Sequence, residues 1–233
     1  MPELPEVETI TRGLMARLLG KRLLSFKLNR RDLRKPVPPG LKAKLEGRRV
    51  IAITRRAKYI LFHLEGGGVL IAHLGMSGRL VLADAENALP PARHDHAVLE
   101  FEDGVELRLN DARRFGLLDY AAESDLAAHK LFRHLGPEPL EPQFDGAKLA
   151  ALLKGKKTSI KAALLDQRVV AGLGNIYVSE SLYGAGLSPK RLAGRVQGAR
   201  ADELANAIRD VLERAIAAGG SSLRDYVQAS GEL

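Results

Sequence analysis

The sequence predicts an α+β protein: an N-terminal β-sandwich domain with a leading helix, followed by a helical domain. Three observations indicate this fold class. Short alternating or apolar runs follow the first segment at the spacing of strands in a sandwich or barrel. A stretch with three prolines then interrupts the pattern, and beyond it the spacing is helical and alanine is frequent. We therefore expect a domain at 1–133, a hinge linker at 134–144 and a helical domain at 145–233.

The first segment, residues 3–19, has the spacing of an amphipathic helix. Val7, Ile10 and Leu14 recur at intervals of three or four residues. Glutamates occupy its first turn, where the helix dipole favours negative charge. The sequence thus predicts a helix ahead of the first strand.

Short segments separated by Gly, Pro, Asn and Asp predict the strands. Asp103-Gly104, between two of them, is typical of a hairpin turn. Helical spacing predicts four helices in the C-terminal part. The expected strands are 22–30, 49–56, 58–64, 68–74, 78–82, 96–101, 105–110 and 116–120, and the expected helices are 145–153, 159–165, 175–183 and 201–218.

Composition excludes several classes of protein. With 233 residues, 45% hydrophobic and 27% charged, the chain is long enough for a core in each domain and is not predominantly disordered. No stretch approaches the ~18 uncharged apolar residues of a membrane span, and the acidic N-terminus is unlike a secretory signal. We therefore expect a cytoplasmic protein. The absence of cysteine excludes disulfides, thiolate zinc sites and cysteine nucleophiles.

Positive charge is concentrated in one part of the chain. The net charge is +8, yet residues 12–58 hold sixteen basic and two acidic residues. Such a local excess favours a polyanionic partner, nucleic acid first. A solvated basic surface and attraction to anionic lipid remain alternatives.

The N-terminus carries a potential nucleophile. If Met1 is removed, Pro2 becomes a free secondary amine, and α-amino groups have a pKa of about 7.7–8.0 against ~10.4 for lysine. Attack of this amine on an aldehyde-like carbon gives an iminium ion, and Glu3 or Glu6 could move protons there. Taken alone, the pattern fits equally a common Met-Pro start with acids serving the helix dipole.

PELPEVETI at residues 2–10 resembles the opening of the formamidopyrimidine-DNA glycosylase family, and further family blocks follow in order over essentially the whole chain. The resemblance implies a bifunctional DNA glycosylase and AP lyase of base excision repair. It would excise 8-oxoguanine and formamidopyrimidines through a Schiff base on the N-terminal proline. The blocks are RRAKYI (55–60), HLGMSGRL (73–80), HDH (94–96), DARRFG (111–116), HLGPEPL (134–140), KKTSIKAALLDQ (156–167), VAGLGNIYVSESLYGAGLSP (170–189) and GGSSLRDY (219–226).

The resemblance assigns catalytic roles to Pro2, Glu3 and Lys58, the lysine assisting proton transfer and contacting the lesion. Met76, Arg113 and Phe115 would occupy the space that the extruded base leaves, which offsets part of the unstacking cost. Without the resemblance, an inward-packed methionine, a surface arginine and a core phenylalanine are the plainer interpretations. Lys58 would then be one more phosphate-facing or solvated lysine.

The resemblance also implies contacts with the DNA backbone. His94, Lys156 and Asn175 would contact DNA, and we group Glu6 with them. Amides of the glycine-rich turn 171–174, at the start of a helix–two-turn–helix motif, would bind phosphate. The loop at 219–226 would close over the extruded purine. His94-Asp95-His96 lacks further ligands nearby in sequence, so we expect no metal there.

The sequence departs from the family at its C-terminal end. Family members continue into a zinc finger held by four cysteines, and this chain has no cysteine. We expect no cofactor in this chain, and duplex DNA with an oxidised purine or abasic site as the partner of a monomer. A truncated protein and a naturally finger-less variant both remain open. So do a non-catalytic remnant that binds damaged DNA and a general RNA-binding protein, although few aromatics are present for base stacking.

Overall fold

The computed structural model describes residues 1–84 and 90–219. Its described residues form two compact units, which we take separately: Met1–Pro2 with Glu6–His129, and Glu3–Pro5 with the chain from Lys130 to residue 219. Residues 220–226 of the expected lesion-closing loop lie outside the described residues. No helix within the described ranges has the length and apolar character needed to cross a membrane.

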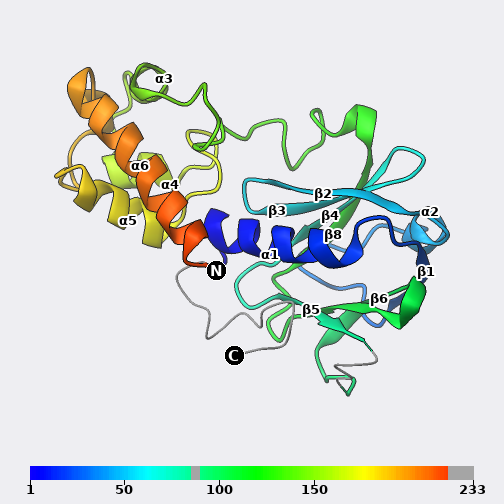
Figure 1. Ribbon diagram of the computed structural model, residues 1–233. Helices are drawn as coiled ribbons and strands as arrows, with labels where there is room; N and C mark the ends of the chain where they lie inside the picture. The colour runs from blue at the N-terminus through cyan, green and yellow to red at the C-terminus, as the bar shows by residue number, and fades with distance from the viewer. Residues whose placement is uncertain (85–89, 220–233) are drawn as a thin grey trace. The chain divides into compact units, whose positions relative to one another are not determined.

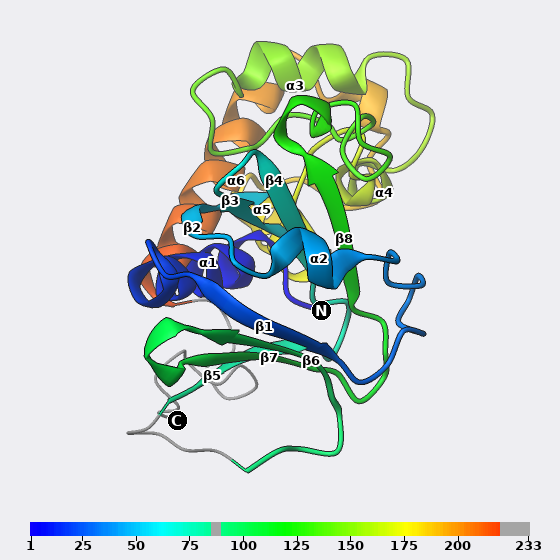
Figure 2. The same cartoon turned by 90° about the vertical axis from the view of Figure 1, so that its right-hand side faces the viewer.

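The first unit contains two antiparallel four-stranded sheets. Figures 1 and 2 show their strands and α1 from two directions. α1 (Leu4–Leu18) precedes them, so the predicted leading helix and all eight predicted strands are confirmed. One sheet has the order β1-β6-β7-β5, built from β1 (Leu23–Leu28), β6 (Asp95–Phe101), β7 (Glu106–Asn110) and β5 (Arg79–Ala83). The other has the order β2-β3-β4-β8, built from β2 (Val50–Arg56), β3 (Tyr59–Leu64), β4 (Gly68–His73) and β8 (Leu117–Ala122).

One hydrophobic core joins the two sheets and α1. Leu14 of α1, Phe62 of β3 and Phe101 of β6 all belong to it and are almost completely buried. Burial of a side chain of this size contributes about 1.5–3 kcal/mol. The apolar stripe of α1 and the inward-facing residues of both sheets therefore hold the sandwich together.

Two short segments illustrate what local sequence does and does not reveal. Asp103 and Gly104 both have a φ of 72°, and the Phe101 N–H donates to the Val105 carbonyl at 2.8 Å. Both residues adopt the left-handed conformation that Asp and Gly tolerate, so the predicted turn between β6 and β7 is confirmed; it is a three-residue loop that also includes Glu102. The five-residue α2 (Leu41–Leu45), by contrast, is too short to show helical periodicity, and it was not predicted.

The second unit is helical, as predicted. Its helices are α3 (Gly146–Leu153), α4 (Ile160–Leu165), α5 (Asn175–Gly184) and α6 (Ala199–Ala217). The side chains of Asp145 and Ser159 cap α3 and α4 by accepting backbone N–H groups three residues on. Leu4 joins the core of this unit although it lies at the other end of the sequence.

The segment 134–144, expected as a linker, belongs to this second unit. The N–H of Gly136 donates to the Gln167 carbonyl at 2.8 Å. Phe144 is 1% exposed, and the Arg209 guanidinium donates to its carbonyl at 2.8 Å. The segment therefore packs onto the helices and is not a free linker.

Candidate active site

Glu3 lies at the N-terminus of α5. Its side chain is buried, and its carboxylate accepts the N–H groups of Gly174 at 2.7 Å, Ile176 at 3.0 Å and Tyr177 at 3.3 Å. The first N–H groups of a helix have no partners within the helix, and the helix dipole favours an anion there. Glu3 therefore supplies the cap that Gly174, which has no side chain, does not provide.

The predicted phosphate contact of the glycine-rich turn is therefore wrong for Gly174. Its amide donates to the carboxylate of Glu3, and the amides of Ile176 and Tyr177 donate to the same carboxylate. Within the same turn, the N–H of Gly172 donates to the side chain of Gln167 at 2.8 Å. A helix N-terminus does bind an anion here, but the anion is a carboxylate of this chain. Asn175, the first residue of α5, is exposed.

Pro2 directly precedes this fixed carboxylate in the chain. It is buried, whereas Met1 is 50% exposed. With Met1 in place the proline nitrogen is part of a peptide bond and is not basic. Removal of Met1 would convert it into the secondary amine that the predicted chemistry requires.

Lys58 lies in the two-residue loop that joins β2 to β3. Arg56 and Tyr59 are paired on either side of this loop, and Lys58 is only 6% exposed. Ala57, which precedes it, has a φ of 54°. The interpretation of Lys58 as a solvated surface lysine is therefore wrong.

Met76 and Phe115 lie on two loops of the first unit that pack closely together. A Cβ at Gly75 would lie 2.3 Å from the carbonyl carbon and oxygen of Phe115, so the backbones are in direct contact. Met76 is 46% exposed and Phe115 43% exposed. The guanidinium carbon of Arg113 lies 4.8 Å from the centroid of the Phe115 ring. Neither apolar side chain is a core residue, and the structure brings the predicted space-filling residues together.

Asp111 joins these two loops from the inside. It is completely buried; Oδ1 accepts the Ser77 hydroxyl at 2.7 Å and the Arg113 N–H at 3.2 Å, and Oδ2 accepts the Gly116 N–H at 2.6 Å. Buried carboxylates persist where hydrogen bonds satisfy them. No role was predicted for Asp111, although an aspartate directly after a strand is a common turn-forming residue.

The exposed Asp32 contacts the loop that carries Arg113 and Phe115. Its Oδ1 accepts Nε–H of Arg30 and its Oδ2 accepts Nη2–H, both at 2.9 Å, and it is also hydrogen-bonded to Arg114. The bonds from Arg30 lower the pKa of Asp32 below its usual value. Arg114 has a φ of 58°, a conformation that costs a non-glycine residue about 1–2 kcal/mol. The Asp32 contact therefore stabilises a strained residue between Arg113 and Phe115.

His73, at the end of β4, is a further residue that sequence reasoning left without a role. It is 7% exposed, its Nδ1 accepts the Gly75 N–H at 2.9 Å, and the Tyr59 ring lies 4.8 Å away between centroids. Burial, together with Arg34 and Lys58, lowers the pKa of His73 to about 4. The imidazole is therefore neutral at pH 7 and faces a region of positive potential.

The remaining predicted residues are divided between the two units. His94 is half-buried, whereas Asp95 and His96 are buried and bond to Asn110 at 2.8 Å and to the Asp111 carbonyl at 2.7 Å respectively. Within the described ranges, no three His, Cys, Asp or Glu side chains are placed to hold a metal ion. In the second unit Lys156 is half-buried ahead of α4, and in the first unit Glu6 is 5% exposed.

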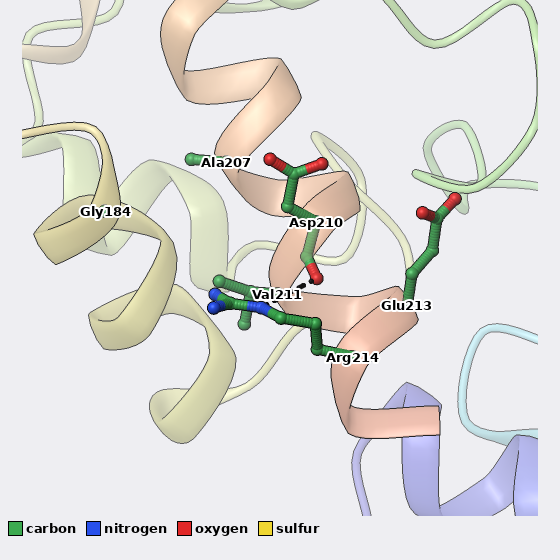
Figure 3. Close-up of a pocket in the computed structure, with 6 residues that line it drawn as sticks. All are labelled: Gly184, Ala207, Asp210, Val211, Glu213 and Arg214. Carbon is green, nitrogen blue, oxygen red and sulfur yellow. Dashed lines mark hydrogen bonds between the residues drawn. The ribbon is translucent and has the colours of Figure 1, made fainter. Parts of the chain in front are cut away.

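A hollow in the second unit lies between α5 and α6. Figure 3 shows the side chains of Asp210 and Arg214 on α6 at its edge, and the Arg214 Nε donates to the backbone carbonyl of Asp210 at 3.3 Å. None of the predicted site residues lines it. The lining residues are Gly184, Ala207, Asp210, Val211, Glu213 and Arg214.

Comparison with known proteins places this architecture in a class. The model of the formamidopyrimidine-DNA glycosylase N-terminal domain matches residues 1–118, and that of the H2TH domain of the same glycosylases matches residues 135–227. A formamidopyrimidine-DNA glycosylase of Cereibacter sphaeroides is 56% identical over 100% of this chain and 84% of its own length. One of Paracoccus denitrificans is 53% identical, with the same coverage.

Solved structures agree with these matches. A complex of Lactococcus lactis Fpg (MutM) with DNA containing N7-benzyl-Fapy-dG has a TM-score of 0.89 at 35% identity, covering 99% of this chain and 85% of that one. The MutM (Fpg) protein of Thermus thermophilus has a TM-score of 0.87 at 41% identity, covering 99% and 83%. The sandwich and the H2TH unit thus define a class of DNA-repair fold. Within that class, this chain belongs to the formamidopyrimidine-DNA glycosylase family.

Proposed function

We propose that the protein is a DNA glycosylase with AP lyase activity that removes oxidised purines from duplex DNA in base excision repair. Its substrates are 8-oxoguanine and formamidopyrimidines, and Pro2 is the nucleophile. The observation that carries the proposal is the fixed position of Glu3, whose carboxylate accepts three N–H bonds at the start of α5. The residue that must react is joined to it by one peptide bond.

The reaction begins with removal of Met1, which frees the Pro2 amine. The amine nitrogen forms a bond to C1′ of the deoxyribose while the C1′–N9 bond breaks, and the base leaves with the bonding electrons and takes up a proton. Opening of the sugar ring gives an iminium ion, which acts as an electron sink. Loss of a C2′ proton then breaks the C3′–O3′ bond and releases the phosphate. Glu3 and Lys58 carry these protons.

The exposed residues of the first unit hold the duplex open. Met76 and Phe115 enter the space left by the extruded base, and Arg113 hydrogen-bonds the opposite base. Two features support this role: both apolar side chains are exposed, and Asp111 fixes their loops to one another. His94, Lys156 and Asn175 contact the backbone, where phosphate contacts position the enzyme without reading sequence.

Borohydride trapping tests the proposal. Intact-mass measurement first establishes the fraction of chains that lack Met1. The full chain is then incubated with duplexes that contain 8-oxoguanine or an abasic site, and borohydride is added. We expect a covalent protein–DNA adduct at the mass of the Met1-free chain, and we expect Pro2→Gly to abolish it while the fold is retained.

The other outcomes are equally informative. Lesion-selective binding without an adduct from Met1-free protein would identify a non-catalytic damaged-DNA-binding protein. Binding with no preference for lesion-containing duplex over RNA would contradict the proposal in all its parts.

A further inference from the structure

The structure points to a positioning device for Lys58: we infer that Arg55, held by Glu8, fixes the loop that carries this lysine through the carbonyl of Ala57. The inference deepens the proposed function, because it assigns new residues to the placement of a proton-carrying lysine. Arg55 and Glu8 are assigned as positioning residues, because they act through the loop that carries Lys58.

Arg55 makes two contacts at once. Its side chain, in β2, is 8% exposed; Nε donates to Glu8 Oε2 of α1 at 2.9 Å, and Nη1 donates to the Ala57 carbonyl at 3.0 Å. The rigid, planar guanidinium presents its donors in fixed directions, so one contact determines the direction of the other. A lysine has a single point-like ammonium and does not reproduce this geometry.

The Ala57 carbonyl is the point at which this contact reaches Lys58. The carbonyl belongs to the planar peptide that joins Ala57 to Lys58, so a bond to the oxygen fixes the orientation of the Lys58 N–H as well. Ala57 has a φ of 54° and is 1% exposed. A non-glycine residue adopts this conformation at a cost of about 1–2 kcal/mol, so the surrounding contacts must hold it in place.

Glu8 holds the Arg55 guanidinium in place on the side away from Ala57. Its second oxygen, Oε1, accepts Arg12 Nε at 2.8 Å. Burial opposes the charged carboxylate, but the bonds from Arg12 and Arg55 outweigh it and leave the pKa of Glu8 lowered. Arg12 is 63% exposed, and within the described residues no bond from it to the lysine loop is seen, which makes it a matched control for Arg55.

A double-mutant cycle between Arg55 and Lys58 in the full chain tests the inference. The measured quantity is the single-turnover rate of excision from an 8-oxoguanine duplex at saturating enzyme. We expect Arg55→Gln to lower the rate about tenfold or more, because small misplacements of reacting groups are costly. Glu8→Gln lowers it less, and Arg12→Gln leaves it unchanged. In a Lys58→Ala background, adding Arg55→Gln has no further effect, since the residue that it positions is gone.

Several results would overturn the inference. Additive effects of Arg55→Gln and Lys58→Ala would show a general structural role, and so would a rate for Arg12→Gln as low as that of Arg55→Gln. If Arg55→Gln does not fold, the same cycle is run with Glu8→Gln, and additivity there overturns the inference equally. Absence of excision by the Met1-free wild-type chain would refute the proposed function instead, so the two failures are distinguishable.

Discussion

Glu3 and Gly174 fit together so closely that a single added methyl group has no room between them. A Cβ at position 174 would lie 2.3 Å from Cδ of Glu3. The position of the Glu3 carboxylate therefore requires a glycine at 174, although 171 positions separate the two residues in the sequence.

Gly174→Ala tests this relationship. The methyl group must displace the Glu3 carboxylate from the N–H groups of α5, so we expect a loss of about 1–3 kcal/mol in the free energy of unfolding. The borohydride adduct should fall in the same variant. Gly184→Ala in the same helix is the control, because its Cβ would meet only Ala207 at 3.7 Å. Equal stability of the two variants in urea unfolding would contradict the prediction.

Asp111→Ala should destabilise the first unit markedly. The substitution leaves the N–H groups of Arg113 and Gly116 without their buried acceptor, and we expect a loss on the order of 3 kcal/mol in chemical unfolding. Asp103→Asn, at an exposed turn, should change stability by less than about 0.5 kcal/mol. A loss below about 1 kcal/mol for Asp111→Ala would show that the buried bonds do not hold the loops.

The strain at Arg114 can be measured by comparing two substitutions. Arg114→Ala and Arg114→Gly both lose the contact with Asp32, but only glycine relieves the left-handed conformation. We expect the glycine variant to be more stable than the alanine variant by about 1 kcal/mol. Thermal unfolding of the two proteins side by side provides the measurement, and the reverse order would refute the assignment of strain.

His73 predicts a specific pH dependence. Its pKa is lowered to about 4 in the folded protein from an ordinary value of 6.5, so the unfolded chain binds the proton more readily. The contribution of His73 to the free energy of unfolding is fully present above pH ~6.5. It decreases by on the order of 3 kcal/mol as the pH falls toward ~4. His73→Asn should remove this component of the pH profile. His134→Asn, at an exposed histidine, should keep it, and parallel profiles for wild type and His73→Asn would exclude the effect.

Phe115→Ala should separate activity from stability. The side chain is 43% exposed, so its removal should change the free energy of unfolding by less than about 0.5 kcal/mol. Excision from a lesion duplex should fall about tenfold, which corresponds to ~1.4 kcal/mol of the unstacking cost. Leu24→Ala, another exposed apolar residue of the first unit at 52%, is the control. Unchanged excision by Phe115→Ala would remove this residue from the site.

Much of the fold could be predicted because its elements have local causes. Short alternating or continuously apolar runs specified the strands, three-to-four spacing specified the helices, and Asp103-Gly104 specified a turn. The short α2 and the packing of residues 134–144 could not be predicted in this way. The first is below the length at which periodicity is visible, and the second depends on Gln167 and Arg209, which lie far along the chain.

The sequence by itself determined the fold class, the family and the residue types available for chemistry, because these follow from local periodicity and ordered motifs. Only the tertiary structure decided which groups meet. It placed the Glu3 carboxylate on the amides at the start of α5 and Asp111 between two loops. It also brought the Arg55 guanidinium to the carbonyl of Ala57, next to Lys58. Hydrogen bonds between distant residues depend on how the chain folds back on itself, and no spacing along one segment encodes them.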